Sequence, residues 1–162
     1  MDLMIRNYLD RAENELVLSA SIKRLSDESE AKKYFNIDGG FTFYSAAITH
    51  AYYSIFYSAK AILLTKQVTT SSPDVHKKTL EAFQQHFVVT GILDVKLLEI
   101  YRKLVVRADE LLGIFKEEKQ KRGDFTYKTI PQANQEPAGD SIKNAKIFFS
   151  NIKKVIEGMQ ER

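Results

Sequence analysis

The sequence contains no cysteine, and this absence excludes disulfide bonds, thiolate metal ligands and a cysteine nucleophile. Tryptophan is also absent, and the 162 residues include only three prolines and three histidines. No histidine is spaced from another histidine or a glutamate as in the known metal-binding helix motifs, so we expect no metal site. The chain also lacks a glycine-rich phosphate loop, and we expect no cofactor.

The composition is ordinary for a folded soluble protein, with 44% hydrophobic and 28% charged residues. The length suits a single domain over residues 1–162 and is sufficient for a hydrophobic core. A net charge of +3 is weak evidence for a nucleic-acid partner. The first residues show no apolar stretch of the kind found in signal peptides, so we expect a cytoplasmic protein.

The most informative segment is Tyr44–Leu64, which reads YSAAITHAYYSIFYSAKAILL. It has one charged residue, Lys60, and no glycine or proline, so it predicts a long helix that is apolar on nearly every face. Its histidine, tyrosines and lysine make it too polar for a membrane span, and we expect no membrane association. Such a helix needs partners on several sides, either within the chain or from a second copy.

The remaining hydrophobic pattern also has a helical period, with no sustained strand-like alternation. The sequence therefore predicts an all-α, antiparallel helical bundle of about five main helices. We expect Ser72 and Pro73 to start the third helix, Asp94 to cap the fourth, and Asp140 or Ser141 to cap the fifth. The predicted helices cover residues 2–25, 42–67, 73–89, 94–121 and 141–160.

Two places offer polar side chains suited to binding an anion. His76 falls in the first turn of the third helix, beside Lys77 and Lys78, where free backbone N–H groups favour a phosphate. Arg122, Asp124 and Tyr127 lie within six residues after the fourth helix, and arginine is suited to bidentate phosphate contact. Taken alone, each pattern is more often a solvated helix end, because basic residues complement the dipole at a helix C-terminus.

Four segments in order resemble the HEPN domain (higher eukaryotes and prokaryotes nucleotide-binding), in particular its small stand-alone prokaryotic branch. They are HAYYSIFYSAKAILLTKQ from His50, PDVHKKTLEAFQQHFVVTG from Pro73, RADELLGIFKEEKQKRGDFTY from Arg107 and SIKNAKIFFSNIKKVI from Ser141. The resemblance implies a helical bundle, a homodimer, and a role with nucleotides or RNA in toxin–antitoxin or defence modules. It also implies a minimal nucleotidyltransferase as the partner protein.

Active relatives of this family are metal-independent ribonucleases with an arginine followed, after four to six residues, by a histidine. The arginine would stabilise the charged transition state, and the histidine would move the proton of the 2′-hydroxyl. This chain departs from that pattern, because Arg122 is followed after four residues by Tyr127. A phenol with a pKa of about 10 is a poor general base near neutrality. Catalysis therefore stays open, and His76 is a candidate for the missing imidazole.

We expect a HEPN-like protein that binds nucleotide or RNA within a two-component module. The candidate binding residues are Arg122, Tyr127, His76, Asp124 to orient the arginine, and Tyr53 for stacking. A metal-independent ribonuclease toxin is the first alternative, and a non-catalytic structural dimer or protein adaptor is the second.

Overall fold

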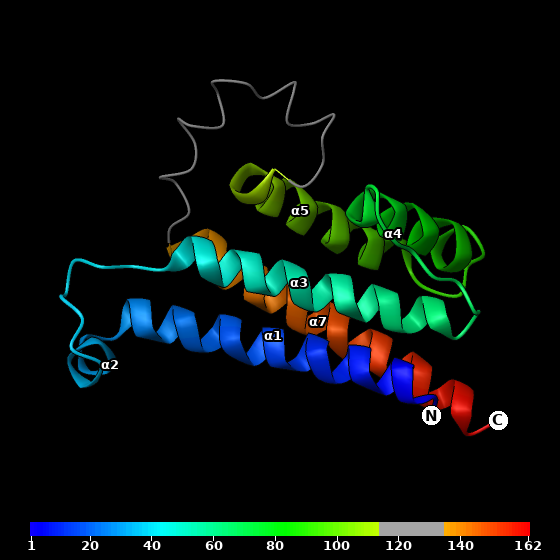
Figure 1. Cartoon of the computed structure of the whole chain (residues 1–162), viewed down its shortest axis with the longest axis horizontal. Coiled ribbons are helices and arrows are strands. Elements are labelled where there is room, and N and C mark those ends of the chain that lie inside the picture. The colour runs from blue at the N-terminus through cyan, green and yellow to red at the C-terminus, as the bar shows by residue number, and fades with distance from the viewer. Residues whose placement is uncertain (114–134) are drawn as a thin grey trace.

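The computed structural model describes residues 1–113 and 135–162, and these residues form helices without any strand (Figure 1). The predicted all-α bundle is confirmed. The elements are α1 (Leu3–Asp27), α2 (Ser29–Tyr34), α3 (Tyr44–Leu64), α4 (Val75–Phe83), a π-helical turn (Gln84–Val88), α5 (Val95–Leu112) and α7 (Gln135–Gln160).

The apolar helix α3 is the centre of the bundle. It contacts α1, α7, α5 and α4, and Figure 1 shows it with α1 along one side and α4 and α5 along the other. Twelve of its 21 residues are buried. The chain therefore covers most of the apolar surface of α3 by itself, and the hydrophobicity of this helix does not require a second copy. None of the helices in the described residues is long and apolar enough to cross a bilayer.

An aromatic cluster joins α4, α5 and α7. The ring of Phe83 lies 5.5 Å from that of Tyr101 and 5.3 Å from that of Phe148, between ring centroids. All three side chains are fully buried. Aromatic side chains contribute the largest buried areas in a core, so this cluster fixes α4 relative to the other helices.

The start of α5 is confirmed, and α1 begins within one residue of its predicted start at residue 2. The Asp2 carboxylate accepts a hydrogen bond from the Met4 N–H at 2.7 Å, at the start of α1. Asp94 caps α5 in the same way, because its carboxylate accepts from the Lys96 N–H at 2.8 Å. Each cap satisfies a backbone donor that the helix leaves unpaired.

Three other predicted boundaries are wrong. Helix α4 starts at Val75 rather than Pro73, because Asp74 before it has a left-handed backbone with a φ of 57°. Helix α5 ends at Leu112 rather than running on through Gly113, and residues 114–121 of the predicted helix lie outside the described residues. Gly113 follows it with a φ of 61°, a conformation that glycine adopts readily at helix ends.

The third wrong boundary is the start of α7, which lies at Gln135 rather than Ser141. Pro137 is tolerated because the N–H groups in the first turn of a helix have no acceptor within the helix, so the missing donor of proline breaks no hydrogen bond. Asp140 is consequently inside the helix and is not its cap. Its carboxylate instead binds Arg107 of α5 at 2.8 Å and Lys103 at 2.9 Å, so it ties α7 to α5.

Candidate nucleotide and RNA site

His76 lies in the first turn of α4, against the aromatic face of α3. Its Nδ1 is 2.7 Å from the hydroxyl of Tyr52, which is 24 residues away in the sequence. Its ring is 4.5 Å from that of Phe56, between centroids, and 6.0 Å from that of Tyr53. His76 is therefore a half-buried side chain with a fixed orientation rather than a solvated histidine at a helix end.

The Tyr52 hydroxyl decides which tautomer His76 adopts. Tyr52 is fully buried, and in the part of the chain that the structure describes His76 is the one hydrogen-bond partner of its hydroxyl. A buried O–H needs an acceptor, so the hydroxyl donates to a bare Nδ1. The proton of the neutral imidazole is then on Nε2. His76 Nε2 is consequently a donor, and it does not have the lone pair that a general base needs.

The surroundings of this pair favour its uncharged form. Burial lowers the pKa of His76 below its ordinary value of 6.5, and the nearby Lys60 ammonium lowers it further. Burial also raises the pKa of the Tyr52 phenol, with smaller contributions from Tyr101 and Tyr53. Near pH 7 both groups are neutral, so the hydrogen bond between them is present.

Tyr53 lies beside His76, on the half-exposed side of α3. Its ring meets His76 at an angle of 65° and stacks on Tyr57, with centroids 6.2 Å apart. Burial raises the pKa of its phenol. The structure therefore brings together two of the five predicted site residues, His76 and Tyr53. The other three, Arg122, Asp124 and Tyr127, lie outside the described residues.

Sequence reasoning did not assign Tyr52, Tyr57 or Lys60 to the site. The positions of Tyr53, Tyr57 and Lys60 on α3 are spaced by four and three residues, so they share one helix face, and this spacing could have indicated their grouping. The sequence offered no comparable signal for the contact between Tyr52 and His76, because it depends on how α4 packs on α3.

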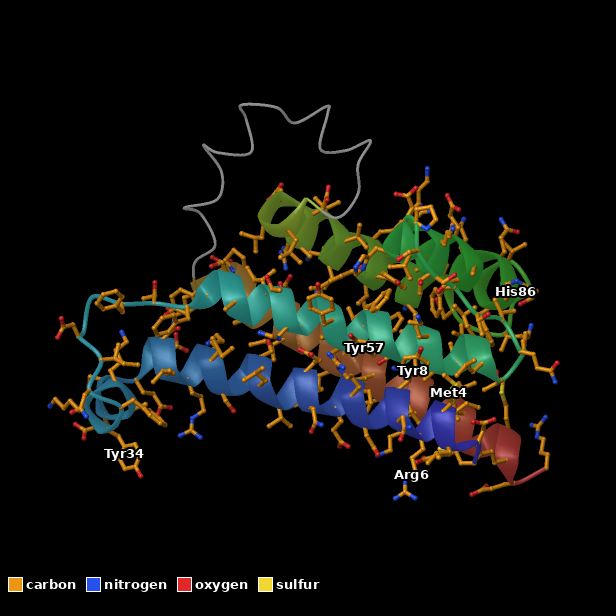
Figure 2. All side chains as sticks on the ribbon, in the orientation of Figure 1. Met4, Arg6, Tyr8, Tyr34, Tyr57 and His86 are labelled. Carbon is orange, nitrogen blue, oxygen red and sulfur yellow. The ribbon has the colours of Figure 1, made fainter. Side chains whose placement is uncertain are left out.

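The other two histidines have different surroundings. His50 Nδ1 is 2.5 Å from the Glu15 carboxylate, and this pair joins α3 to α1. His86 lies in the π-helical turn, where its backbone carbonyl accepts from Lys66 at 2.7 Å; Figure 2 shows it at one end of the molecule. Within residues 1–113 and 135–162, no group of three histidine or acidic side chains could hold a metal ion.

Comparison with known proteins places the chain in a family. A protein of Methanocaldococcus jannaschii named "Putative toxin MJ0605" is 31% identical over 114 residues, which are 70% of this chain and 72% of that protein. A "UPF0332 protein" of Thermotoga maritima is 30% identical over 115 residues, or 71% of this chain and 74% of that protein. "Putative toxin MJ0142", also of M. jannaschii, is 44% identical over 57 residues, or 35% and 37% of the two chains.

No solved structure is significantly similar to the chain. Residues 23–155 match the HEPN domain. The matched range is most of the sequence and includes α3, α4, α5 and most of α7. The chain belongs to the HEPN domain family.

Proposed function

We propose that this protein is a toxin-type HEPN protein that binds RNA or a nucleotide at the surface formed by His76 and Tyr53. The observation that supports this most directly is the hydrogen bond from Tyr52 to His76, which holds an imidazole N–H donor beside a half-exposed tyrosine ring. An imidazole and a tyrosine ring that lie side by side can pack against a base, while the cations near them bind a phosphate oxygen.

The charges near His76 suit an anionic ligand. Lys77 and Lys78 follow it in the first turn of α4, and Lys60 of α3 is close enough to depress its pKa. The start of α4 adds the positive end of the helix dipole. Arg122, Asp124 and Tyr127 remain predicted members of the same site, with Arg122 as the phosphate ligand.

Fluorescence anisotropy with a labelled RNA oligonucleotide and with labelled ATP tests this proposal. A His76→Ala variant is expected to bind more weakly than the unmodified protein. His86→Ala is the matched control, because it removes a second histidine near the other end of the same helical segment and is expected to bind normally. Equal affinity of the two variants would remove His76 from the site. Unchanged affinity of an Arg122→Ala variant would remove Arg122.

Cleavage of RNA is the second candidate function, because two M. jannaschii relatives are named putative toxins and active members of the HEPN family are ribonucleases. The tautomer assigned to His76 argues against this residue as the base, so cleavage would depend on Arg122 and Tyr127. Incubation of RNA with the protein in EDTA separates the two functions. Intact RNA is expected under our proposal; metal-independent cleavage that Tyr127→Phe abolishes would establish the ribonuclease instead.

We further propose, from the family resemblance, that the protein is a homodimer and works with a nucleotidyltransferase partner encoded beside it. Analytical ultracentrifugation tests the dimer, and co-purification with the product of the neighbouring gene tests the partner. A structural dimer or protein adaptor is the remaining alternative. It predicts no measurable affinity for RNA or nucleotide in the anisotropy assay.

A further inference from the structure

Three tyrosines form a continuous ladder of rings between α1 and α3. Tyr8 of α1 stacks on Tyr57 of α3 with centroids 6.1 Å apart and an interplanar angle of 21°. Tyr57 stacks on Tyr53 at 6.2 Å and 27°, and the edge of Tyr53 meets His76 at 6.0 Å. Figure 2 labels Tyr8 and Tyr57 where α1 and α3 lie side by side. We call Tyr8, Tyr57 and Tyr53 the tyrosine ladder.

The ladder is not part of the fully buried core. All three tyrosines are half-exposed, whereas Tyr52, their neighbour on α3, is fully buried. The structural aromatic cluster of this bundle, formed by Phe83, Tyr101 and Phe148, is by contrast fully buried. The ladder instead presents ring edges and hydroxyl groups at the surface.

Two cations lie over the faces of the ladder. The Arg11 guanidinium is 4.7 Å from the centroid of Tyr57, and the Lys60 ammonium is 5.3 Å from that of Tyr8. Cation–π contacts of this length hold the charges in place at the surface. The Arg11 side chain is 61% exposed, so a ligand can reach it.

An acidic side chain, Glu15, lies beside one of these cations. The Glu15 carboxylate forms a long ion pair with Arg11, at 3.9 Å, and also contacts His50 Nδ1 at 2.5 Å. The Glu15 side chain is 15% exposed and that of Arg11 is 61% exposed, so the guanidinium is the more accessible of the two charges. The Lys60 ammonium donates to the backbone carbonyl of Thr70 at 3.2 Å, a neutral acceptor. The ladder is thus a half-exposed aromatic surface with two cations and one less exposed carboxylate, and a ligand with both aromatic rings and negative charge complements its exposed groups.

We propose that the tyrosine ladder binds single-stranded RNA, with its phosphates on Arg11 and Lys60 and its bases against the exposed tyrosine edges and the Arg11 guanidinium. The strand continues from His76 along Tyr53 and Tyr57 to Tyr8, from α4 to α1. This inference rests on the proposed function and specifies its ligand. A row of successive rings with cations along it matches how proteins hold single strands, and it exceeds what one mononucleotide can cover.

A second copy of the chain is the competing occupant of this surface. A twofold interface centred on the ladder would bring Arg11 and Lys60 close to the same two cations of the other copy, and like charges that face each other oppose association. Charge complementarity therefore favours RNA over self-association at this surface.

The test measures the affinity of a labelled single-stranded RNA and of labelled ATP by anisotropy, over a range of salt concentrations. Tyr57→Leu removes the stacking ring but keeps apolar bulk, and it is expected to weaken RNA binding about 10-fold, the typical effect of losing one stacked base. Tyr57→Phe keeps the ring and is expected to bind normally. ATP affinity is expected to change much less than RNA affinity.

Arg11→Gln tests the electrostatic part without risk to the fold, because its side chain is largely exposed. It is expected to weaken RNA binding and to reduce the slope of log affinity against log salt by about 0.7, the contribution of one phosphate contact on a single strand. Lys33→Ala, which removes a 75% exposed lysine at the α2 end, is the control and is expected to leave both quantities unchanged.

Three results would overturn the inference in distinguishable ways. If His76→Ala weakens RNA binding but Tyr57→Leu and Arg11→Gln do not, the ladder is not on the path of the RNA and the proposed function stands. If the unmodified protein binds no RNA, the proposed function fails as well. If either ladder variant converts a dimer to a monomer in sedimentation velocity, the ladder is an interface between copies.

Discussion

Replacing Tyr52 by phenylalanine tests the hydrogen bond on which the site assignment depends. The change removes one hydroxyl and keeps the ring, which packs 5.6 Å from Tyr53 and 6.3 Å from Phe56 between centroids. A neutral hydrogen bond contributes about 1 kcal/mol net to stability, so we expect a loss of about that size. For a chain of this length the midpoint of thermal unfolding would fall by about 2–4 °C.

The same substitution changes the titration of His76. The hydroxyl stabilises the neutral imidazole by donating to Nδ1, so its removal is expected to raise the pKa of His76. Denaturant unfolding followed by circular dichroism measures the stability, and NMR titration of the imidazole protons measures the pKa. Nitrogen-15 shifts of the imidazole report the tautomer directly.

Tyr101→Phe is the matched control. Tyr101 is also fully buried, but its hydroxyl has no hydrogen-bond partner among the described residues. Removing an unsatisfied buried hydroxyl costs no hydrogen bond, so this variant is expected to be as stable as the unmodified protein or more stable. The reasoning is refuted if Tyr52→Phe leaves both stability and the pKa of His76 unchanged, or if the neutral imidazole has its proton on Nδ1.

Three further predictions concern stability. The pKa of His76 is lowered in the folded state, so the unfolded chain binds more protons as the pH falls below about 6.5. The free energy of unfolding should therefore decrease below pH 6.5 and level off below the pKa of the folded state. Denaturant unfolding of the unmodified protein and of His76→Ala at several pH values measures this. Asp140→Asn should lower the free energy of unfolding by at most about 1 kcal/mol at pH 7, because Lys103 and Arg107 lower the pKa of this partly exposed carboxyl. The difference in stability between the variant and the unmodified protein should vanish as the pH falls well below 3.8. A difference that persists there would contradict the ion pairs. Phe148→Ala should lower the free energy of unfolding in urea by about 3–5 kcal/mol, because the side chain is fully buried. Val106→Ala, at a 56% exposed position, should change it by less than about 0.5 kcal/mol. Equal losses in the two variants would place Phe148 outside the core.

The sequence predicted the parts of the fold that depend on local pattern. The apolar tract at residues 44–64 is α3, and the predicted cap Asp94 starts α5. Hydrophobic spacing also identified most of the buried side of α5, such as Leu97, Tyr101 and Leu104. These features follow from helical periodicity and from the chemistry of helix ends.

The errors came from tertiary contacts that outweigh local propensity. Pro137 and Gly139 suggested a loop, but the structure continues α7 back to Gln135. Arg107 of α5 stabilises this extra turn by hydrogen bonding to Asp140 and Ser141. The apolar character of α3 left open whether its partners come from this chain or from a second copy, because the sequence does not show that α1, α4, α5 and α7 all pack on it.

The site was predicted only in part. His76 and Tyr53 were selected by chemistry and resemblance, and the structure places them in contact. The roles of Tyr52 and Tyr8 require the packing of α4 and α1 on α3, which joins residues 24 and 49 positions apart in the sequence. No spacing rule along one helix can reveal such pairs.

Photochemical crosslinking tests the central claim most directly. A short RNA with 4-thiouridine is irradiated in complex with the unmodified protein, and the crosslinked peptides are identified by mass spectrometry. We predict crosslinks in the α3 peptide that includes Tyr53 and Tyr57 and in the α4 peptide that includes His76. Efficient crosslinking that misses both peptides would contradict the binding surface described above.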